Sequence, residues 1–481
     1  MDYADLLSTN EGKTLDFKRD LSSPKGLLKT LVAFANTAGG KVIIGVEDKT
    51  RRPVGVPSPL DEEERLCNLI ADAIQPRLVP NIEMVTVEDQ TLLIAEVFLS
   101  NSRPHFLKSE GPDNGVYVRL GSTNRKADRE LIAELRRSAE GVAFDEMPMP
   151  ELSVDDLDLA AARELFKGRR ELTQRELLTL KLLRKDQGKP VPTRGAMLLF
   201  AKERTFHFPD AWVQCGRFLG RDKTKIFDHI ELYDHLPMAV ESIMLFLKKH
   251  AMRGADISDI RRRDVWSIPL TILREAVINA LVHADYSQRG APVRIAFFDD
   301  RIEIENPGIL LPGLTIEDMK QGISKIRNPV LARVFRELGL IEQWGSGVRR
   351  MFHEAREQGL PEPEILEIGM RVRFIVWLAE HLPVERKSVQ VGAQVEAQVE
   401  AQVDIDILSA CAPTPLSSAE IAASLGHRQL SGNLRKALPR LKNAGLLEYT
   451  IPDKPKSRLQ KYRLTEKGKA LLDTVGGRHE K

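Results

Sequence analysis

The sequence has few cysteines and no long apolar run. Its three cysteines, Cys67, Cys215 and Cys411, lie far apart and form no Cys-x-x-Cys pair. This spacing argues against a zinc site or a disulfide framework and predicts reduced thiols. No segment approaches the roughly 18 apolar residues that a membrane span needs, and the acidic N-terminus is unlike a signal peptide. We therefore expect a cytoplasmic protein without membrane contact.

The chain also lacks an excess of charge of one sign, with a net charge of +2 over 481 residues. No global field indicates a nucleic-acid partner, so any such signal must be local. Apolar residues make up 42% of the chain and charged residues 29%, which is typical of a soluble globular protein. The length predicts about three or four domains of ordinary size.

A phosphate-binding P-loop is missing as well. Gly12-Lys13-Thr14 is similar to the end of a Walker motif, but the required first glycine would fall at Leu7. Without that glycine the loop cannot wrap a phosphate. The sequence has no other candidate, so we expect no helicase motor.

The most informative stretch is Arg274–Tyr286, in which apolar residues recur at helical spacing and predict one buried stripe. Glu275 and Asn279 lie four residues apart and therefore project side by side from one helix face. A carboxylate beside an amide can hold Mg²⁺ through water and orient a water molecule at a triphosphate. Two β-rich runs follow, and then the glycine segments Asn306-Pro307-Gly308 and Gly345-Ser346-Gly347.

This order of helix, sheet, glycine turn and glycine lid resembles the Bergerat ATPases, such as gyrase, MutL and the histidine kinases. Within that group it is similar to the divergent module of bacterial Schlafen-like regulators, related to the RecG helicase C-terminus. The resemblance implies ATP and Mg²⁺ as cofactors of an ATPase, with Glu275 as the water-activating base and Asn279 as a metal ligand. The other implied nucleotide-binding residues are Asn306, Gly308, Gly345 and Gly347.

The glycine turn departs from the Bergerat pattern, which reads Asp-x-Gly-x-Gly. Asn306 stands where that Asp receives the adenine amino group, and the second glycine is absent. An Asn carbonyl accepts the same hydrogen bond, but as a neutral and weaker acceptor. Two interpretations therefore stay open: a nucleotide-binding domain, with or without hydrolysis, and a fold that has lost its nucleotide.

The first 130 residues carry a second set of motifs. They read Glu-x-x-x-x-Asp-Phe-Lys from Glu11, Ala-Phe-Ala-Asn-Thr-Ala-Gly-Gly from Ala33, and Ile-Gly-Val-Glu-Asp from Ile44. This order resembles the Schlafen-type AlbA-like domain over most of residues 1–130. The resemblance implies a domain that binds nucleic acid, either DNA or RNA.

In the nuclease members of that family three carboxylates bind metal, and the resemblance places them at Glu11, Asp16 and Asp48. Three carboxylates at one site repel unless a cation or protons intervene, and a bound cation can generate hydroxide at a phosphodiester. The alternative is that these acids lie at strand ends of a domain that only binds nucleic acid. Lys18 is expected on the opposite strand face from Asp16, where it would contact a phosphate.

Basic residues surround a glycine turn in the same region. Arg119, Arg125 and Lys126 flank Gly121, whose backbone donors could join them in a phosphate cradle. The alternative is that these side chains are only solvated.

Residues 150–265 show no recognisable chemistry and are interpreted as a connecting domain. Periodicity predicts helices over Asp155–Phe166, Thr173–Lys185 and Leu236–His250, and strands over Ala196–Phe200 and Ala211–Phe218. Arg217, Arg221, Lys223 and Lys225 form a basic run that is interpreted as a solvated turn, with contact to a phosphate backbone as the alternative.

A four-residue repeat, Ala-Gln-Val-Glu or Asp, runs from Ala393 to Asp404. On a helix its three valines fall nearly in line, which predicts a helical spacer or a dimer seam, and hence a homo-oligomer. Beyond it, helical segments followed by two strands predict a winged helix, typical of bacterial transcription regulators.

The basic charge of the chain is concentrated in that last segment. Residues 405–481 carry 14 lysine and arginine residues against 7 acids, a net charge of +7. Such a set favours phosphate contacts with DNA, although a winged helix used for protein contacts stays open. The candidate DNA-binding residues here are Arg428, Arg435, Lys436, Arg440, Lys456 and Arg458.

These signals together predict a multidomain α/β (α+β) fold. Its parts are an AlbA-like domain (1–135), a connecting α/β domain (150–265), a divergent Bergerat-like α/β sandwich (266–380), a repeat linker (383–404) and a winged helix (405–475). The expected function is a DNA-binding transcription regulator gated by ATP. The alternatives are a metal-dependent nuclease of a Schlafen-like, phage-defence type, and a scaffold with inactive sites.

Overall fold

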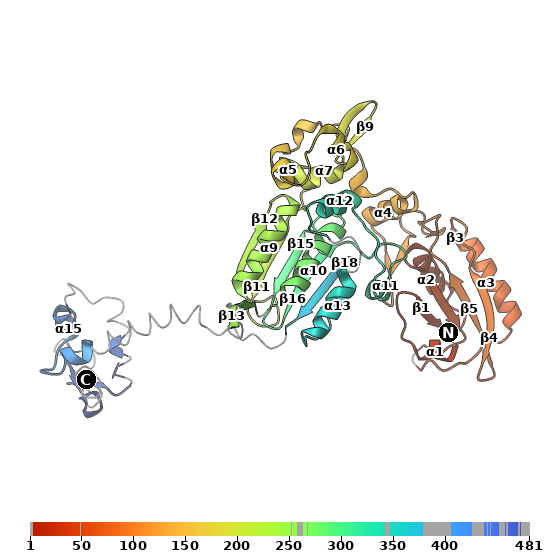
Figure 1. Ribbon diagram of the computed structural model, residues 1–481. Helices are drawn as coiled ribbons and strands as arrows, with labels where there is room; N and C mark the ends of the chain where they lie inside the picture. The colour runs from red at the N-terminus through yellow and green to blue at the C-terminus, as the bar shows by residue number, and fades with distance from the viewer. Residues whose placement is uncertain are drawn as a thin grey trace. The chain divides into compact units, whose positions relative to one another are not determined.

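The computed structural model divides into two compact units, Met1–Leu382 and Pro383–Lys481 (Figure 1). Each unit is described by itself. Among the residues described, no helix has the length and apolar character needed to cross a membrane. The described residues are 3–48, 50–251, 253–256, 263–266, 268–341, 347–378, 406–425, 437–439, 441–442, 444–451, 457, 460–469 and 472.

The first unit begins with a four-stranded sheet. Its strands, in spatial order, are β1 (Leu15–Lys18), β2 (Gly40–Ile44), β5 (Gln90–Val97) and β4 (Asn81–Val87). The helices α2 (Pro24–Asn36) and α3 (Pro59–Ala73) accompany it, and the shorter elements are α1 (Tyr3–Ser8), β3 (Ile74–Gln75) and β6 (Phe106–Leu107). β1 and β2 are parallel, because α2 carries the chain back between them. Leu27, Leu31 and Phe34 of α2 are almost completely buried.

A hairpin and a helix add a second small core to this region. β7 (Tyr117–Leu120) pairs with β8 (Thr123–Lys126), and α4 (Arg129–Ala139) follows. The Asp128 side chain caps α4 by accepting a hydrogen bond from Leu131 N. Ile309, from far along the chain, is buried in the same core.

A six-stranded sheet forms the centre of the first unit. Its strands, in spatial order, are β12 (Ile226–Leu232), β11 (Val213–Phe218), β15 (Val293–Phe297), β16 (Arg301–Pro307), β18 (Arg371–Trp377) and β17 (Glu364–Ile368). β11 pairs with β15 in parallel, and all the other neighbours are antiparallel. The expected connecting domain is therefore not separate, because its strands complete the sheet of the domain that follows.

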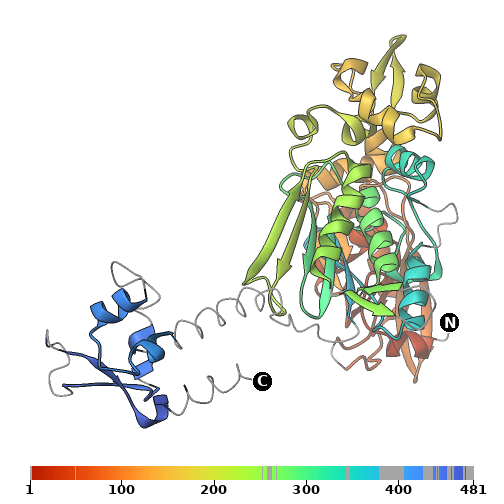
Figure 2. The same cartoon turned by 60° about the vertical axis from the view of Figure 1, so that its left-hand side comes forward.

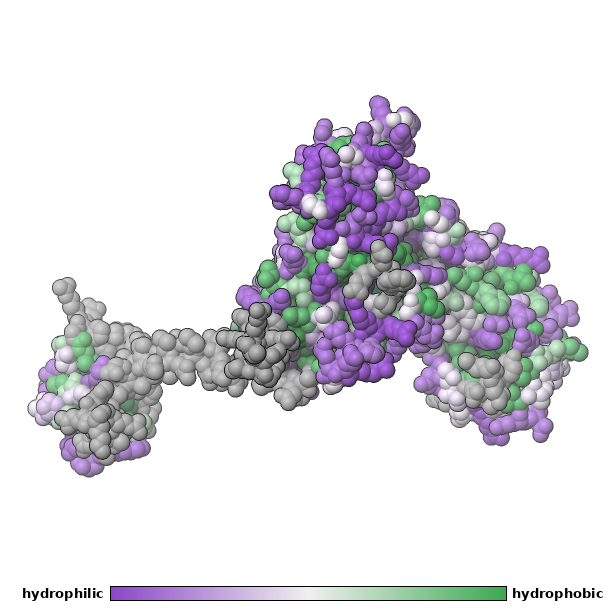
Figure 3. All heavy atoms as spheres, in the orientation of Figure 1, coloured by the Kyte–Doolittle hydropathy of each residue, from purple (hydrophilic) through white to green (hydrophobic). Residues whose placement is uncertain are grey.

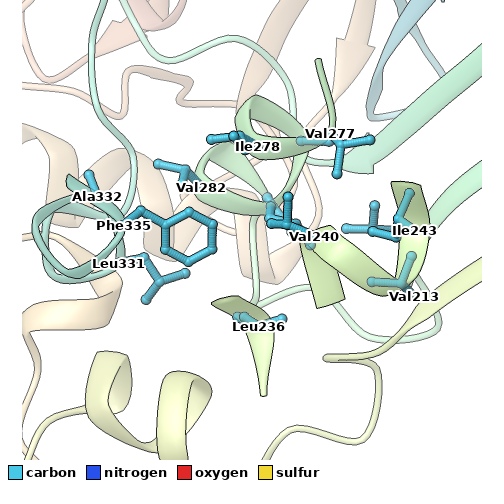
Figure 4. Close-up of a cluster of buried hydrophobic side chains, with 14 of the residues drawn as sticks. Val213, Leu236, Val240, Ile243, Val277, Ile278, Val282, Leu331, Ala332 and Phe335 are labelled. Atoms are coloured by element: carbon cyan, nitrogen blue, oxygen red, sulfur yellow. The ribbon is translucent and has the colours of Figure 1, made fainter. Parts of the chain in front are cut away.

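The helices on this sheet share one apolar core with it (Figure 4). They are α9 (Leu236–His250), α10 (Leu270–His283), α11 (Ile316–Gln321), α12 (Pro329–Glu337) and α13 (Gly347–Glu357). The single buried stripe predicted for α10 is too narrow, because α10 contacts α9, α13 and β16 at once. Ile272, Ala276 and Ala280 are consequently buried together with the predicted residues.

A lobe of short elements precedes β11 (Figure 2). It contains α5 (Leu159–Phe166), α6 (Gln174–Thr179), β9 (Leu183–Asp186), β10 (Lys189–Pro192), α7 (Arg194–Phe200) and α8 (Arg204–His207), after the turns η1 (Phe144–Glu146) and η2 (Val154–Asp156). The strand predicted over Ala196–Phe200 is wrong, since this segment is α7. Its N-cap, Thr193, accepts a hydrogen bond from Ala196 N, and periodicity alone cannot separate a short apolar strand from a buried helix.

The helix predicted over Thr173–Lys185 is also wrong in its second half. It ends at Thr179, and the chain then forms the β9–β10 hairpin. A further hairpin, β13 (Arg253–Asp256) with β14 (Arg263–Trp266), lies between α9 and α10.

The second unit is described in part. α15 (Ser418–Ser424) begins with the predicted capping box between Ser417 and Glu420, and β19 (Leu447–Tyr449) pairs with β20 (Tyr462–Leu464). The repeat linker, Gly345 and the six candidate DNA-binding residues of this unit lie outside the described residues.

Candidate nucleotide-binding site

A cavity of about 480 Å³ lies against α10, α13 and the end of β16. Its lining includes Glu275 and Asn279 from α10, Asn306 from β16 and Gly347 from α13. The fold thus brings together four residues that the sequence singled out. The volume lies within the range of roughly 300–1,000 Å³ that is usual for small-molecule sites.

Glu275 is the centre of a small polar network in this cavity. Asn279 Nδ2 donates to Glu275 Oε1 at 3.3 Å, and Arg350 Nη2 lies 3.3 Å from Glu275 Oε2. A Cβ placed on Gly347 would overlap the Glu275 carboxylate. A larger residue at this position would therefore force the Glu275 carboxylate to move.

Asn306 presents one atom for recognition. Its Nδ2 donates to Pro307 O at 3.2 Å and to His283 O at 3.5 Å. Since backbone carbonyls occupy the amide donor, Oδ1 is the group left to accept from a ligand. Burial lowers the pKa of His283 to about 4, so this neighbouring ring is neutral at pH 7.

Cations line the cavity at positions that the sequence analysis missed. Among the described lining residues, Lys325, Arg327, Arg336 and Arg350 face one acid, Glu275. The rest of the wall is largely apolar. Such a lining favours an anionic ligand with an apolar part. No local motif carries this signal, because the four cations come from separate segments that only the fold assembles.

Arg327 connects the cavity to the N-terminal region. Its Nη1 donates to Glu134 of α4, and its Nη2 donates to Ile309 O. Burial lowers the pKa of Arg327 to about 10, so the guanidinium stays charged at pH 7.

The segment 309–314 forms part of the cavity wall and also packs on the N-terminal region; we call it the shared wall. Gly313 N donates to Thr37 O at 2.6 Å. Leu310 N donates to Glu367 Oε1 at 2.8 Å, and Lys13 Nζ donates to Glu367 Oε2 at 2.7 Å. A displacement of the shared wall would therefore alter contacts both in the cavity and in the N-terminal region. Gly308, just before it, packs against Asp285 and Arg327.

The N-terminal carboxylates do not form the predicted metal site in the part of the chain that the structure describes. Asp16 is 3% exposed and lies 2.7 Å from Arg119 Nη2 and 2.5 Å from Lys18 Nζ. Glu11 accepts from Phe17 N at 2.9 Å, while Asp48 is exposed. No group of three or more His, Cys, Asp or Glu residues among those described could hold a metal ion.

The expectations for Lys18 and Arg119 are wrong. Lys18 lies on the same strand face as Asp16, because residues two apart on a strand share a face. Arg119 is 1% exposed and donates to Gly12 O, Leu15 O and Asn124 Oδ1. It holds the domain together and presents no donor at the surface, whereas Arg125 is exposed.

Family models match two parts of the first unit. The model described as "Schlafen, AlbA_2" matches residues 11–128. The model described as "Putative ATP-dependent DNA helicase recG C-terminal" matches residues 290–376. The chain combines a Schlafen AlbA_2 domain with a RecG-related, ATPase-like domain. Such a pair is typical of a DNA-binding protein of the ATPase type.

Two parts of the chain lie outside these two matched ranges, namely the α10 residues of the cavity and the C-terminal segment. Glu275 and Asn279 precede the matched part of the RecG-related domain, so their roles rest on the geometry of its cavity. Residues 402–465 match the C-terminal domain of the Fic-like, filamentation-induced-by-cAMP proteins. The winged helix expected there stays a prediction.

Solved structures offer distant similarities. A Corynebacterium diphtheriae protein is 22% identical, with 98% of this chain and 97% of that chain covered and a TM-score of 0.42. The N-terminal domain of a RecG-related helicase protein from Nitrosomonas europaea is 28% identical over 26% of this chain and 89% of that chain, with a TM-score of 0.22. A Fic family protein from Desulfovibrio desulfuricans is 15% identical over 71% and 77%, with a TM-score of 0.13. A search of curated proteins gave no match.

Proposed function

We propose that this protein is a DNA-binding transcription regulator whose affinity for DNA is set by ATP in the cavity of its RecG-related domain. One observation carries the proposal: the cavity lined by Glu275, Asn279 and Asn306 is bounded by the shared wall (309–314), which also packs on the AlbA_2 domain. A ligand of the cavity therefore contacts a segment that the AlbA_2 domain also contacts.

The lining suits a nucleoside triphosphate. Arg336, Arg350 and Lys325 supply positive charge for phosphate oxygens. Apolar side chains such as Ile304 and Phe374 supply a surface for the base. The magnesium ion of such a ligand supplies charge neutralisation, and the oxygens of Glu275 and Asn279 are the groups that would hold it, mostly through water.

Arg350 is the residue best placed to sense occupancy. It pairs with Glu275 at 3.3 Å, so it holds the carboxylate needed to orient water. Phosphate oxygens in the cavity compete with Glu275 for this guanidinium. When Arg350 turns to phosphate, Glu275 loses this ion pair and keeps its contact with Asn279.

Arg327 then links occupancy to the AlbA_2 domain. The same guanidinium lines the cavity and donates to Glu134 of α4. The regulatory role itself is supported by the basic C-terminal segment, because its net charge of +7 favours contacts with DNA phosphates.

Calorimetry on the full chain tests the first step. We expect ATP to bind in the presence of Mg²⁺ and to change the affinity for a labelled DNA duplex by at least about fivefold, a usual lower size for allosteric coupling. Absence of ATP binding, or binding that leaves the DNA affinity unchanged, would contradict the proposal.

A further inference from the structure

The lobe before β11 carries a basic surface that no family match covers. Residues 163–189 contain nine lysine and arginine residues against four acids, in a chain with a net charge of only +2. We call α5, α6 and the β9–β10 hairpin the basic lobe. The matched ranges end at residue 128 and resume at residue 290.

Most of this charge is exposed. Arg170 is half-buried, and the exposed bases are Arg163, Lys167, Arg169, Arg175, Lys181, Arg184, Lys185 and Lys189. Lys167 pairs with Glu164 at 3.1 Å, and Lys181 pairs with Glu146 at 2.5 Å. The other six exposed bases form no ion pair with any residue that the structure describes. Unneutralised positive charge at this density favours an anionic partner.

The bases are spread over two hollows and a projecting hairpin. One hollow of about 830 Å³ is lined by Arg163, Lys167 and Arg169. Another of about 590 Å³ is lined by Arg175 and Lys185. Both hollows adjoin the start of α6. Figure 3 shows this lobe as mostly hydrophilic, and Figure 1 shows the β9 hairpin projecting from it.

The hairpin is shaped to present its charges outward. In the register of the two strands Asp186 lies opposite Lys189, and the turn between them has positive φ angles, 46° at Gln187 and 83° at Gly188. Such angles are those of a tight hairpin turn. Arg184, Lys185 and Lys189 therefore lie on a short ribbon, and a two-stranded ribbon fits the major groove of a duplex.

The composition of the basic lobe (α5, α6 and the β9–β10 hairpin) favours duplex over single-stranded nucleic acid. Its one aromatic residue, Phe166, has no exposed surface. Binding of single strands relies on exposed aromatic rings on which bases stack. A surface of bases without rings is suited to the regular phosphate backbone of a duplex.

We propose that the basic lobe is a contact surface for duplex DNA, which it binds through the phosphate backbone, with the β9–β10 hairpin against the duplex. The proposal rests on DNA binding as the proposed function and adds a surface to it. The lobe is fastened to α12, because Arg170 Nη2 lies 3.2 Å from Glu337 and Arg333 Nη1 donates to Thr179 O at 3.2 Å. The surface therefore adjoins a helix that lines the nucleotide cavity.

The test replaces Arg184, Lys185 and Lys189 together by alanine in the full chain. The matched control replaces Arg221, Lys223 and Lys225 by alanine. These three also lie at an exposed hairpin turn, but acids accompany them: Arg221 lies 3.4 Å from Asp300, and Lys223 lies 4.0 Å from Glu303. Fluorescence anisotropy with a labelled 30-base-pair duplex at several salt concentrations gives affinity and salt slope.

We expect the hairpin triple variant to lose roughly tenfold or more in affinity at low salt. Its slope of log K against log salt should fall by about three, since each phosphate contact contributes about 0.9. The control should keep wild-type values within about twofold. A variant with Arg184→Lys, Lys185→Arg and Lys189→Arg should also bind like wild type, and thermal melting reports whether each variant folds.

Equal affinities and slopes for the two alanine triples would overturn the proposal, as would a loss confined to a single-stranded probe. A wild-type chain that does not bind duplex would instead overturn the proposed function, and the basic lobe with it. Wild-type binding is measured in the same titration, so the two failures are distinguished.

Discussion

At the residue scale, the candidate site divides into what spacing predicts and what only folding assembles. Glu275 and Asn279 could be paired from the sequence because residues four apart on a helix share a face. The ion pairs Arg350–Glu275 and Arg327–Glu134 could not be predicted. The partners lie far apart along the chain, and no local sequence pattern connects them. Arg119 shows the opposite error: arginine beside a glycine turn is visible in the sequence, but its burial is not.

Asn279 and Glu275 should have separable roles. We expect Asn279→Ala to abolish ATP binding, because it removes an oxygen ligand and the partner of Glu275 Oε1. Glu275→Gln should keep binding and lose hydrolysis by about a hundredfold or more, as for removal of a general base. Calorimetry and phosphate release measure the two effects. Equal loss of binding in both variants would contradict this division.

Gly347→Val should weaken ATP binding by at least about tenfold, because the added side chain would overlap Glu275 Oε1 and displace this carboxylate. Gly26→Val is the matched control, because a Cβ at this helical glycine meets nothing within 4 Å. Calorimetry on both variants, beside their melting temperatures, separates a local clash from general unfolding. Unchanged ATP affinity in Gly347→Val would show that α13 begins elsewhere when ligand binds.

Because of Asn306, the cavity should discriminate weakly between adenine and guanine nucleotides. Its neutral Oδ1 accepts from an exocyclic amine more weakly than a carboxylate would. We expect ATP and GTP to bind within about tenfold of each other, and Asn306→Asp to raise the preference for ATP. Competition titrations measure the ratio. A strong ATP preference in the wild type would assign base recognition to another group.

At the scale of single elements, helix ends were easier to predict than the choice between helix and strand. α9 has the predicted bounds, and the capping box of α15 was legible from Ser417 and Glu420. The sequence predicts a strand at α7 because the five-residue apolar run Ala196–Phe200 carries no periodicity of its own. Its cap at Thr193 was the signal that could have corrected this.

Asp145 should make the stability of α12 depend on pH. Its Oδ2 accepts from Val330 N at 2.7 Å and Leu331 N at 3.0 Å. Burial nevertheless raises its pKa to about 7, above its ordinary value of 3.8. The folded state then binds the proton more tightly than the unfolded state. This stabilisation is complete below pH 4 and is lost as pH rises through about 7.

Asp145→Asn should remove that dependence. Relative to wild type, we expect the variant to gain stability between pH 5 and pH 8, by on the order of 2–4 kcal/mol. Thermal or denaturant melts at each pH measure the difference. Parallel curves for the two proteins would mean that Asp145 is ionised throughout this range.

At the scale of the whole molecule, the sequence predicts two separate domains, 150–265 and 266–380. In the structure their strands belong to one six-stranded sheet. Pairing of β11 with β15 links residues 213–217 to 293–297, and such long-range pairing leaves no local trace in composition or periodicity. The boundary expected at residue 265 consequently falls inside one sheet and one core. The shared wall was unpredictable for the same reason.

Glu134→Gln should uncouple the two domains while sparing the cavity. Glu134 accepts from Arg327 but does not line the cavity. We expect ATP affinity to stay within about threefold, while the effect of ATP on DNA affinity falls to near one. Glu140→Gln, at the exposed end of the same helix, is the control. By linkage, DNA should also cease to alter ATP affinity, so an intact mutual effect would refute this route.

The contacts of Lys13 and Ile309 also bear on how the chain is made. A ribosome releases residues 11–128 well before Ile309 and Glu367, yet Ile309 completes the core around Val118 and Glu367 is the ion-pair partner of Lys13. Domains generally fold in order of synthesis. Here the small core around Val118 is complete only after Ile309, which is synthesised much later, has been added. A nascent chain paused before residue 309 lacks the last apolar residue of this core. A chaperone would be needed most at that stage of synthesis.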